Sequence, residues 1–584
     1  MRWLKINGLP VDIDDKTAIG IDIQGMDLKE PGVRKIKNSN SFSIPATINN
    51  LAIFDAVGGV QSNYSGLYEI KTVQYGIDND IYINGSKIKV DSISDRISLT
   101  VSEAYDFFDK LKNVKGRAFF NLIDQFMRRN NDIFDYPTAA VGYRTLQSLM
   151  QSYSTSTSGM HIGMAYGSLY DKEFENIPGT VIDDGLPYYK YLESEFGGIK
   201  LAYPRTTQNE AGEDIIDLTV PNSVCPHFFI YAHTLVQAIQ SIYNIDLGLG
   251  SVIPGNAWDD ENFKKILVSV PGLRLVTTNI GHIDRNYYWE QVPSNNDGTY
   301  SYFDPLTNLS IDSYSCYDVL MGLVKLMSAT IDKTETGYVF RRLDKLEDVG
   351  KIVNWSGKLD YEDVEVMKPY IPSYAKKSYI KYDKIEEGTG ELAGAKTVVC
   401  TNQNLAEEAE LFKVKAYVPN FGNFKGEIAP VLSKANALTN PVFLIADGKH
   451  TLPTKITTYS GSIFQRTKFT ALVTLDKLAV YSMQGEYKFF DKVNDAPKFY
   501  DVNLWLTNND IRDVDNFTMI YIKELNGCFY LNKISGFNPD KSIAATSCEL
   551  IRISDRTPVP PADLPYFVDG QGNVFTDGQG NYFY

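Results

Sequence analysis

The sequence is poor in cysteine and has no long apolar run. Its five cysteines are scattered, odd in number and form no Cys-x-x-Cys pair: Cys225, Cys316, Cys400, Cys528 and Cys548. This pattern predicts reduced, mostly buried thiols in a protein that folds in the cytosol. No apolar run approaches the ~18 residues of a membrane helix, and the N-terminal stretch lacks the apolar core of a signal peptide. We therefore expect no membrane segment.

Catalytic and metal-binding motifs are also missing. The sequence has no Gly-x-Ser-x-Gly, no His-Glu-x-x-His and no Cys–His cluster at zinc spacing. Paired carboxylates such as Asp183 and Asp184 fall where loops are expected, and sequence cannot place two of them the roughly 5–10 Å apart that glycosidases use. The five histidines are His161, His227, His233, His282 and His450. His227 and His233 flank an apolar stretch and are predicted to pack rather than to bind metal.

One glycine-rich stretch resembles a nucleotide loop without meeting its requirements. Residues 388–397 contain Gly-x-Gly-x-x-Ala, but Ala395 separates Gly394 from Lys396. A phosphate loop must open a helix, whose N-terminal amides hold the anion, whereas β-branched residues follow here. We interpret the stretch as a mobile hairpin loop.

Three acid-rich stretches resemble calcium loops only in part. Residues 12–15 (DIDD) and 78–80 (DND) lack the glycine that the sixth position of such a loop requires. The repeat Asp-Gly-Gln-Gly-Asn near the C-terminus occurs in only two copies, which favours turn formation. We predict no catalytic residue, no cofactor and no metal, and interpret the chain as non-enzymatic.

Aromatic and acidic residues are abundant. There are 38 Tyr and 30 Phe, residues that favour strands and, for Tyr, surfaces buried against a partner. The net charge is −15, from 57 basic and 72 acidic side chains. Gripping nucleic acid needs clustered Lys and Arg. The acidic balance suits a surface past which DNA slides, or it serves solubility.

Periodicity divides the 584 residues into four regions. Residues 1–112 are predicted as an N-terminal β-barrel-like domain, in which Asn84-Gly85 marks the turn of a hairpin over residues 81–90. Residues 113–364 are predicted as an α+β region. It has helical faces near 118–127, 235–243 and 319–327, a capping box at Ser315 and Asp318, and a hairpin over 330–340.

The remaining strands lie toward the C-terminus. Residues 365–556 are predicted as a second β-barrel-like domain, because short strands recur there at regular spacing. Residues 557–584 form a Pro-rich linker and the Asp-Gly-Gln-Gly-Asn repeat, which we expect to dock on a neighbouring subunit. The predicted fold class is α+β and β-rich, with two tube-like β-barrel domains bracketing an α+β middle region.

Four stretches, in order, resemble a known family, the tail hub or baseplate hub proteins of phages and prophages of Bacteroides-group bacteria. Residues 41–54 (SFSIPATINNLAIF) are similar to its N-terminal signature SFSIPxTxxNxxIF. The other matches are 226–229 with 259–261 and Leu267, then 354–360 (NWSGKLD) with 379–382, and finally 519–522 with 532–535 and 549–553. The terminal repeat is not part of this pattern.

The resemblance implies a structural role in the virion tail. Such a protein is made in the host cytoplasm and forms a ring that lines the channel for DNA ejection. It joins the tail, or the portal end in a short-tailed crAss-like phage, to distal tip or fibre proteins. We expect a homo-oligomer, with three subunits favoured and six or twelve as alternatives, other tail proteins as partners, and DNA passing without specific binding. A tail-associated glycan- or peptidoglycan-degrading enzyme and a receptor- or glycan-binding tail protein are the alternative functions.

Overall fold

A computed structural model describes part of the chain. The described residues are 2–24, 38–39, 41–54, 71–102, 106–115, 118–119, 122, 126, 160–166, 199–202, 206–208, 214–216, 224–269, 292–293, 300–301, 314–334, 337–360, 365–368, 374–400, 404–424, 427–431, 439–460, 465–495, 498–512, 514–515, 517–540 and 543–554. Asp183, Asp184, His282 and the segment 557–584 lie outside them. The side chains of Cys225, His161, His227 and His450 also lie outside the described part.

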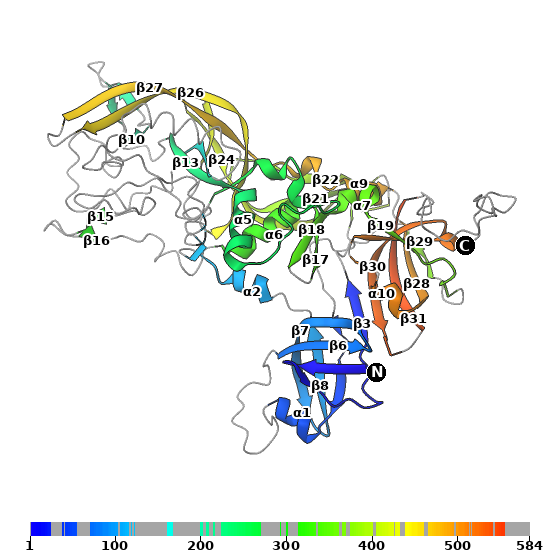
Figure 1. The fold of residues 1–584 in the computed structure, drawn as a ribbon. Helices are drawn as coiled ribbons and strands as arrows, with labels where there is room; N and C mark the ends of the chain where they lie inside the picture. Colours follow the sequence, from blue (N-terminus) through cyan, green and yellow to red (C-terminus); the bar gives the residue numbers. More distant parts are fainter. Residues whose placement is uncertain are drawn as a thin grey trace, which may run out of the picture.

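The largest sheet has 14 strands and joins the two ends of the chain. Its N-terminal strands are β1 (Arg2–Ile6), β2 (Leu9–Pro10), β3 (Ile21–Gln24), β4 (Asn38–Ser39), β5 (Phe42–Pro45), β6 (Lys71–Ile77), β7 (Asp80–Ile93) and β8 (Arg96–Ser102). Its later strands are β19 (Lys351–Asn354), β20 (Glu365–Lys368), β28 (Phe499–Leu506), β29 (Thr518–Ile522), β30 (Gly527–Phe537) and β31 (Ala544–Ser554). Figure 1 shows the blue N-terminal strands meeting the red C-terminal strands at β3.

Strand β3 makes this connection through both backbone pairing and side-chain packing. Ile21 pairs antiparallel with Phe537, and Ile23 pairs with Ile534 of β30. Both isoleucines are buried in the apolar core of the C-terminal strands, together with Phe529. The N-terminal strands otherwise have a core of their own, built from residues such as Leu4, Phe42 and Leu99.

The second sheet has eight strands, of which some precede residue 365 in the sequence and others follow it. They are β9 (Met160–Tyr166), β10 (Ile199–Ala202), β13 (Val224–Tyr231), β14 (Ile266–Val268), β24 (Asn420–Phe424), β25 (Glu427–Val431), β26 (Phe443–Ser460) and β27 (Gln465–Val480). Smaller sheets pair β11 (Thr206–Gln208) with β12 (Asp214–Ile216), β15 (Val292–Pro293) with β16 (Tyr300–Ser301), and β17 (Ala329–Lys333) with β18 (Tyr338–Arg342). A three-stranded sheet has the order β22 (Lys396–Val399), β21 (Lys377–Ile385), β23 (Glu408–Val418).

The predicted fold class, with two tube-like β-barrel domains bracketing an α+β middle, is wrong. The described residues form several separate, mostly open sheets, and none of these closes into a barrel. The strands between 365 and 556 are divided among three sheets instead of forming one barrel. Regular spacing identifies strands, but it does not say which strands pair, because pairing depends on side-chain faces that meet only in the folded chain.

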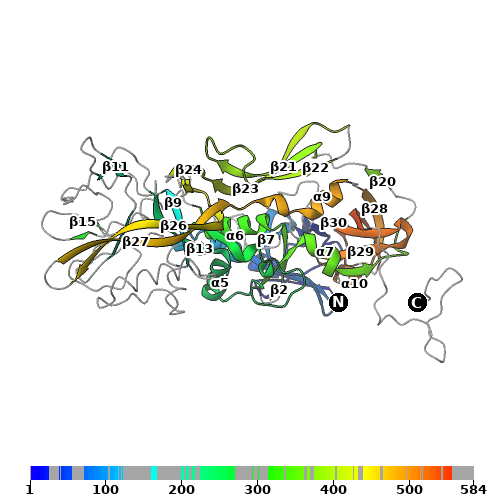
Figure 2. The ribbon, with the colours of Figure 1, turned by 90° about the horizontal axis from the view of Figure 1, so that it is seen from above.

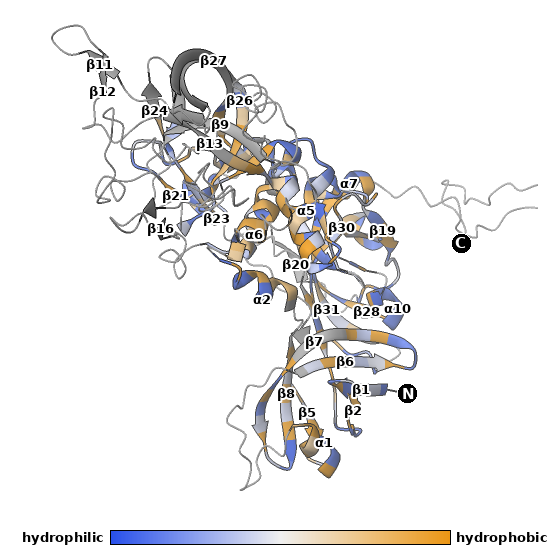
Figure 3. Ribbon diagram, turned by 60° about the vertical axis from the view of Figure 1, so that its left-hand side comes forward, coloured by the Kyte–Doolittle hydropathy of each residue, from blue (hydrophilic) through white to orange (hydrophobic). Residues whose placement is uncertain are grey.

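Helices fill the centre of the molecule. Among the described residues the longest are α5 (Ala232–Tyr243) and α6 (Cys316–Leu326), and Figure 3 shows apolar residues concentrated on them. The others are α1 (Ile48–Ile53), α2 (Asp106–Lys112), α7 (Leu346–Val349), α9 (Lys488–Asp495) and α10 (Asn508–Arg512), with short 3-10 turns η4 (Ala257–Asp259), η5 (Phe263–Lys265), η6 (Leu343–Lys345), η8 (Met483–Gly485) and η9 (Lys523–Leu525). The capping box is confirmed: Asp318 N donates to Ser315 Oγ at 3.2 Å and Ser315 N donates to Asp318 Oδ2 at 2.8 Å.

The expected hairpin over residues 81–90 is wrong, although a hairpin lies next to it. Strand β7 runs through Asn84-Gly85, and the turn falls at Asp78-Asn79, where Asp78 has φ of 52°. The register shifts between Gln74↔Asn84 and Val73↔Ser86, which leaves Gly85 as the extra residue of a bulge. Asp and Asn tolerate the positive φ of a tight turn, so two neighbouring stretches carried the same signal.

Most of the other expected elements are confirmed. The hairpin over 330–340 is β17–β18, and the turn at Asn526-Gly527 joins β29 to β30, with φ of 47° at Asn526. Phe119, Leu122 and Phe126 are helical and buried, as the apolar face near 118–127 predicts. In the described part of the chain, we find no helix with both the length and the apolar character to cross a membrane.

Candidate functional site: a buried charged junction

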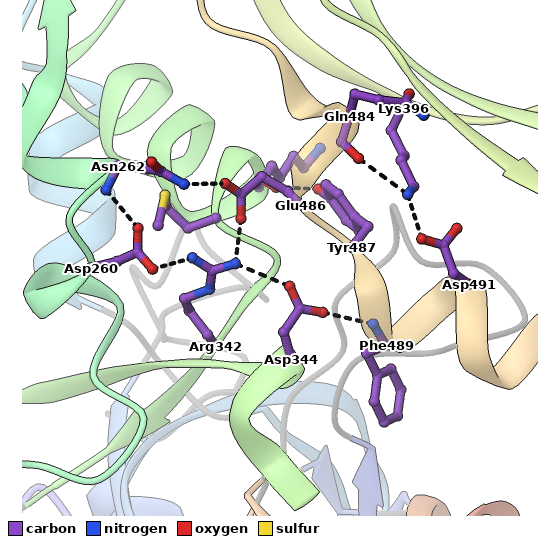
Figure 4. Close-up of polar contacts among 12 residues, drawn as sticks. Asp260, Asn262, Arg342, Asp344, Lys396, Gln484, Glu486, Tyr487, Phe489 and Asp491 are labelled. Atoms are coloured by element: carbon purple, nitrogen blue, oxygen red, sulfur yellow. Dashed lines mark hydrogen bonds and ion pairs between the residues drawn. The ribbon is translucent and has the colours of Figure 1, made fainter. Parts of the chain in front are cut away.

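Arg342 lies at the centre of a cluster of charged side chains that joins three parts of the chain. Strand β18 ends at Arg342, which is followed directly by η6. Its guanidinium binds Asp260, which is 82 residues away beside η4, and Glu486, which is 144 residues away after η8. A third carboxylate, Asp344 of η6, accepts a hydrogen bond from Arg342 Nη2 at 3.1 Å. Figure 4 shows these groups facing one another. We call them the charged junction.

Neutral donors complete the hydrogen bonding of the carboxylates. Tyr481 Oη donates to Glu486 Oε1 at 2.8 Å, and Asn262 Nδ2 donates to the same oxygen at 3.3 Å. The backbone N–H of Phe489, in α9, donates to Asp344 Oδ1 at 2.7 Å. Buried charges are costly unless they are paired and hydrogen-bonded, and these donors supply the additional hydrogen bonds.

The charged side chains at the centre of the junction are buried, so the attraction between them is strong. The side chains of Arg342, Asp344 and Glu486 are 8%, 5% and 2% exposed. Burial alone lowers the pKa of Arg342, but the attraction of Glu486, then of Asp260 and Asp344, outweighs it and raises the pKa overall. Burial, with the nearby Glu486 carboxylate, raises the pKa of Tyr481 far above its ordinary value. Tyr481 therefore stays protonated and remains a donor.

A second ion pair connects the junction region to the glycine-rich stretch. Lys396, in β22, is 4% exposed and binds Asp491 of α9, and its Nζ also donates to the carbonyl of Gln484 at 3.3 Å (Figure 4). The residues before it connect β21 to β22 as an antiparallel pair, which confirms the hairpin loop. The lysine that a phosphate loop would use is thus engaged within the protein.

The other acid-rich stretches are also used structurally. Asp14 accepts from both terminal nitrogens of Arg96, at 2.6 and 2.9 Å, and this contact holds the pKa of Asp14 well below its usual range. Asp12 accepts from Thr47 Oγ1 at 2.6 Å, and Asp78 lies in the β6–β7 turn. Among the residues that the structure describes, no group of three or more His, Cys, Asp or Glu could hold a metal ion.

Burial determines the protonation of the described cysteines and of His233. Cys316, Cys400, Cys528 and Cys548 are buried, which confirms the predicted burial for the described side chains. Burial raises the pKa of Cys316 and Cys548, and burial with Glu347 raises the pKa of Cys528 to about 11. Protonated thiols are weak nucleophiles. His233, half-buried at the start of α5, has a pKa lowered first by burial and then by Lys264, which favours its neutral form.

The junction was not predictable from sequence. Arg341 and Arg342 stand as an adjacent pair at a strand end, and their partners lie far along the chain. Arg341 binds Asp332 at 2.7 Å and Asp515 at 2.6 Å, and its guanidinium lies 4.9 Å from the centre of the Phe517 ring. Both arginines hold segments together, so the arrangement serves to fix the architecture.

The Arg341–Asp515 pair predicts acid sensitivity. Burial raises the pKa of Asp515, but Arg341 and hydrogen bonds from Thr518 and Phe517 outweigh it and lower the pKa overall. A lowered folded-state pKa adds stability above the unfolded value of about 3.9, and this stability is lost as the pH falls through the folded value. With 44% of its side chain exposed, Asp515 is screened by water, so the contribution is at most about 1 kcal/mol.

The test is thermal unfolding between pH 7 and pH 3. We expect Asp515→Asn to lower the melting temperature at pH 7 and the difference from the unsubstituted protein to shrink steadily as the pH falls below about 4. Asp15→Asn, at a fully exposed carboxylate, is the control and should change neither. A difference that stays constant across this range would contradict the assignment.

Comparison with protein-family models finds no match to this chain, and a search of curated proteins finds none.

Proposed function

We propose that this chain is a non-enzymatic structural subunit of a bacteriophage tail hub. In this role it assembles with further copies into a ring around the DNA channel and joins the tail to distal tip or fibre proteins. The proposal places it in the virion tail after synthesis in the host cytoplasm.

The proposal rests on the contact between two of the stretches that resemble tail hub proteins. The stretch 354–360 begins in β19, which pairs in parallel with β29, the start of the stretch 519–522. Trp355 is fully buried and its backbone N–H donates to the Tyr521 carbonyl at 2.8 Å, while Lys523 N donates to Ser356 Oγ at 2.9 Å. Residues more than 150 positions apart in the chain thus form one packed unit. We expect such packing if the stretches that resemble tail hub proteins have a structural role.

The polar residues of the stretch 41–54 support the same interpretation. Asn50 is fully buried; its Oδ1 accepts from Asp12 N and its Nδ2 donates to the carbonyls of Asp12 and Pro45, each at 2.8 Å. Thr47 Oγ1 accepts from Asn50 N at 3.1 Å and caps α1. Arg96 Nε donates to Ser43 Oγ at 2.8 Å. Each polar group is used to fix the turn between β5 and α1, which suits a structural protein.

The preference for three subunits rested on two barrels per subunit presenting six similar units, and this basis is removed by the open sheets. The proposal therefore concerns a closed ring, in which every subunit interface is satisfied, whatever its subunit number.

Imaging and mass measurement of the purified full chain test the proposal. We expect ring-shaped particles with a central hole, several times the 65.6 kDa of one chain, and labelled antibody on the tail axis of virions. A stable monomer with no place on the tail would contradict it. So would release of products from host peptidoglycan or capsule that is abolished by mutating a single acidic residue.

A further inference from the structure

Trp505 is exposed on one face of strand β28. It is 45% exposed, whereas Trp258 and Trp355 are fully buried. Val502 and Leu504 of the same strand are buried in the apolar core on the opposite face. Figure 2 shows β28 toward one end of the molecule and the far ends of β26 and β27 at the other. The ring is therefore accessible to a partner that approaches this end of the subunit.

The surroundings of the Trp505 ring are small or apolar. The residue opposite it on β31 is Ala545, whose side chain is too short to cover the ring. Ile543, two positions before Ala545, is 55% exposed. Proline-rich segments dock on exposed aromatic rings, because their preformed extended conformation costs little entropy to bind. This end of the face therefore suits a proline-rich ligand.

Carboxylates follow Trp505 along the same face. Because successive strand residues alternate between faces, Asp501 shares the face of Trp505, two rows of about 6.6 Å away. Asp501 pairs in register with Glu549 of β31, and Glu549 pairs in turn with Lys533 of β30. Like charges directly opposite each other are unfavourable in a sheet. Lys533 offsets one of the two, so this row keeps a negative charge in excess.

A third carboxylate comes from the segment beside β28. Residues 358–360 run antiparallel to this strand, and Asp360 N donates to the Asn503 carbonyl at 2.9 Å, so Asp360 lies on the same face. Lys358 is also close, but its Nζ binds Asp510 at 2.9 Å. The face therefore combines an exposed aromatic ring with an excess of negative charge. We call this set the tryptophan face: Trp505, Asn503, Asp501, Glu549 and Asp360.

We propose that the tryptophan face binds the proline-rich segment after β31 of a second copy of this chain. Arg556 of that copy lies against the carboxylates, and its Pro560 lies on the Trp505 ring. The inference rests on the proposed ring and names a contact between neighbouring subunits. An arginine suits this site because its charge is opposite and its fork of donors matches a carboxylate. Each carboxylate accepts several hydrogen bonds at once, so partners within the subunit do not exclude it.

The spacing of the segment matches the spacing of the face. The sequence from Arg556 to Pro561 is RTPVPP. A polyproline II helix rises about 3.1 Å per residue, so Arg556 and Pro560 lie about 12 Å apart in it. Asp501 and Trp505 are also four residues apart, in a strand, which places them about 13 Å apart. One rigid segment can therefore reach both ends of the face.

The segment of the same chain is too short to reach Trp505. Strand β31 ends at Ser554, nine positions after Ala545, so its end lies about 30 Å from the Trp505 row. Pro560 is six positions beyond Ser554 and reaches at most about 22 Å even when fully extended. The ligand must therefore come from another copy, and a contact between two different surfaces repeats head to tail and closes into a ring.

Binding of a fluorescent peptide of residues 555–566 to the full chain, measured by anisotropy, tests the docking. The receiving chain carries Arg556→Glu/Pro560→Ala/Pro561→Ala, so that its own segment does not compete. Adding Trp505→Ala should weaken binding at least about tenfold, the effect of losing a central aromatic contact. Adding Val252→Ala, at a fully exposed apolar side chain outside the face, is the control and should change binding by less than about twofold.

A charge exchange tests the position of the arginine. The peptide with Arg556→Glu should bind the receiving chain at least about tenfold more weakly. Adding Asp501→Lys to the receiving chain should restore binding of this reversed peptide by at least about fivefold, because the two charges then attract again. Thermal unfolding checks the fold of each receiving chain. The peptide variants keep the test decisive if a receiving variant misfolds, because they leave the chain unchanged.

The outcomes separate the docking from the ring. Equal binding of the peptide to the Trp505→Ala and Val252→Ala chains, or none to either, would overturn the docking, while rings of the unsubstituted chain would keep the tail hub proposal. An unsubstituted chain that stays monomeric in mass photometry would overturn the ring, and peptide binding would still support the docking. Host capsule polysaccharide that binds through Trp505, with peptide binding unaffected by Trp505→Ala, would assign the face to a glycan and overturn the docking.

Discussion

Replacing Arg342 with methionine is expected to lower the free energy of unfolding by about 3–5 kcal/mol, the effect of removing one partner from a buried ion pair. The substitution keeps an unbranched side chain of similar length but leaves three carboxylates, those of Asp260, Asp344 and Glu486, without their common cation. Two of them are almost fully buried, so water cannot replace the guanidinium. The measurement is denaturant unfolding of the purified chain.

An exposed ion pair provides the matched control. Arg512 is 54% exposed and contacts Asp80 at 3.3 Å, so Arg512→Met should change stability by less than about 1 kcal/mol. A double variant, Arg342→Met/Glu486→Gln, should be more stable than Arg342→Met alone, because it removes one of the unpaired charges. Equal stability of Arg342→Met and Arg512→Met would show that the charged junction does not stabilise the fold.

The substitution Ile21→Ala is expected to cost about 2–5 kcal/mol and to loosen the N-terminal strands from the rest of the chain. Ile21 is 2% exposed and fills the core beneath β30, although it belongs to the first strands of the sequence. The lost methylene groups leave a cavity at the connection between the two ends of the 14-stranded sheet.

Limited proteolysis, followed by mass spectrometry, measures that loosening. We expect Ile21→Ala to release an N-terminal fragment of roughly the predicted domain 1–112 faster than the unsubstituted chain does, because opening the β3–β30 contact exposes backbone. Ile81→Ala is the control, since Ile81 is 53% exposed in β7 of the same region. Identical fragment patterns and stabilities for the two variants would contradict the role of β3.

Local signals predicted the elements well and their partners poorly. The Ser315–Asp318 capping box, the apolar face of α5 and the Asn526-Gly527 turn depend on residues within a few positions of one another, and all were found where predicted. The barrel architecture failed because it depends on which strands meet. Strand β3, with two buried isoleucines, looks like any short strand, and nothing near it in sequence indicates pairing with β30.

The charged junction, like the strand pairing, could not be predicted from sequence. Arg342, Asp260 and Glu486 are ordinary charged residues in a chain with 57 basic and 72 acidic side chains. Only the fold makes them a cluster, by bringing together positions 82 and 144 residues apart. Lys396 illustrates the converse, because the departure of its surroundings from a phosphate loop was visible in sequence, whereas its contact with Asp491 was not.

The pairing of β3 with β30 can form only after nearly the whole chain has been synthesised. Asp22 accepts a hydrogen bond from a backbone N–H 514 residues later in the chain. At about 5–20 residues per second, the ribosome makes the partner of β3 roughly 25–100 s after β3 itself. During this interval the unpaired edge of the N-terminal strands can pair with other chains. The yield of folded protein therefore depends on keeping this edge covered, for example by a chaperone. A chain truncated before β30 cannot complete its largest sheet, so only nearly full-length copies can present a finished subunit for assembly.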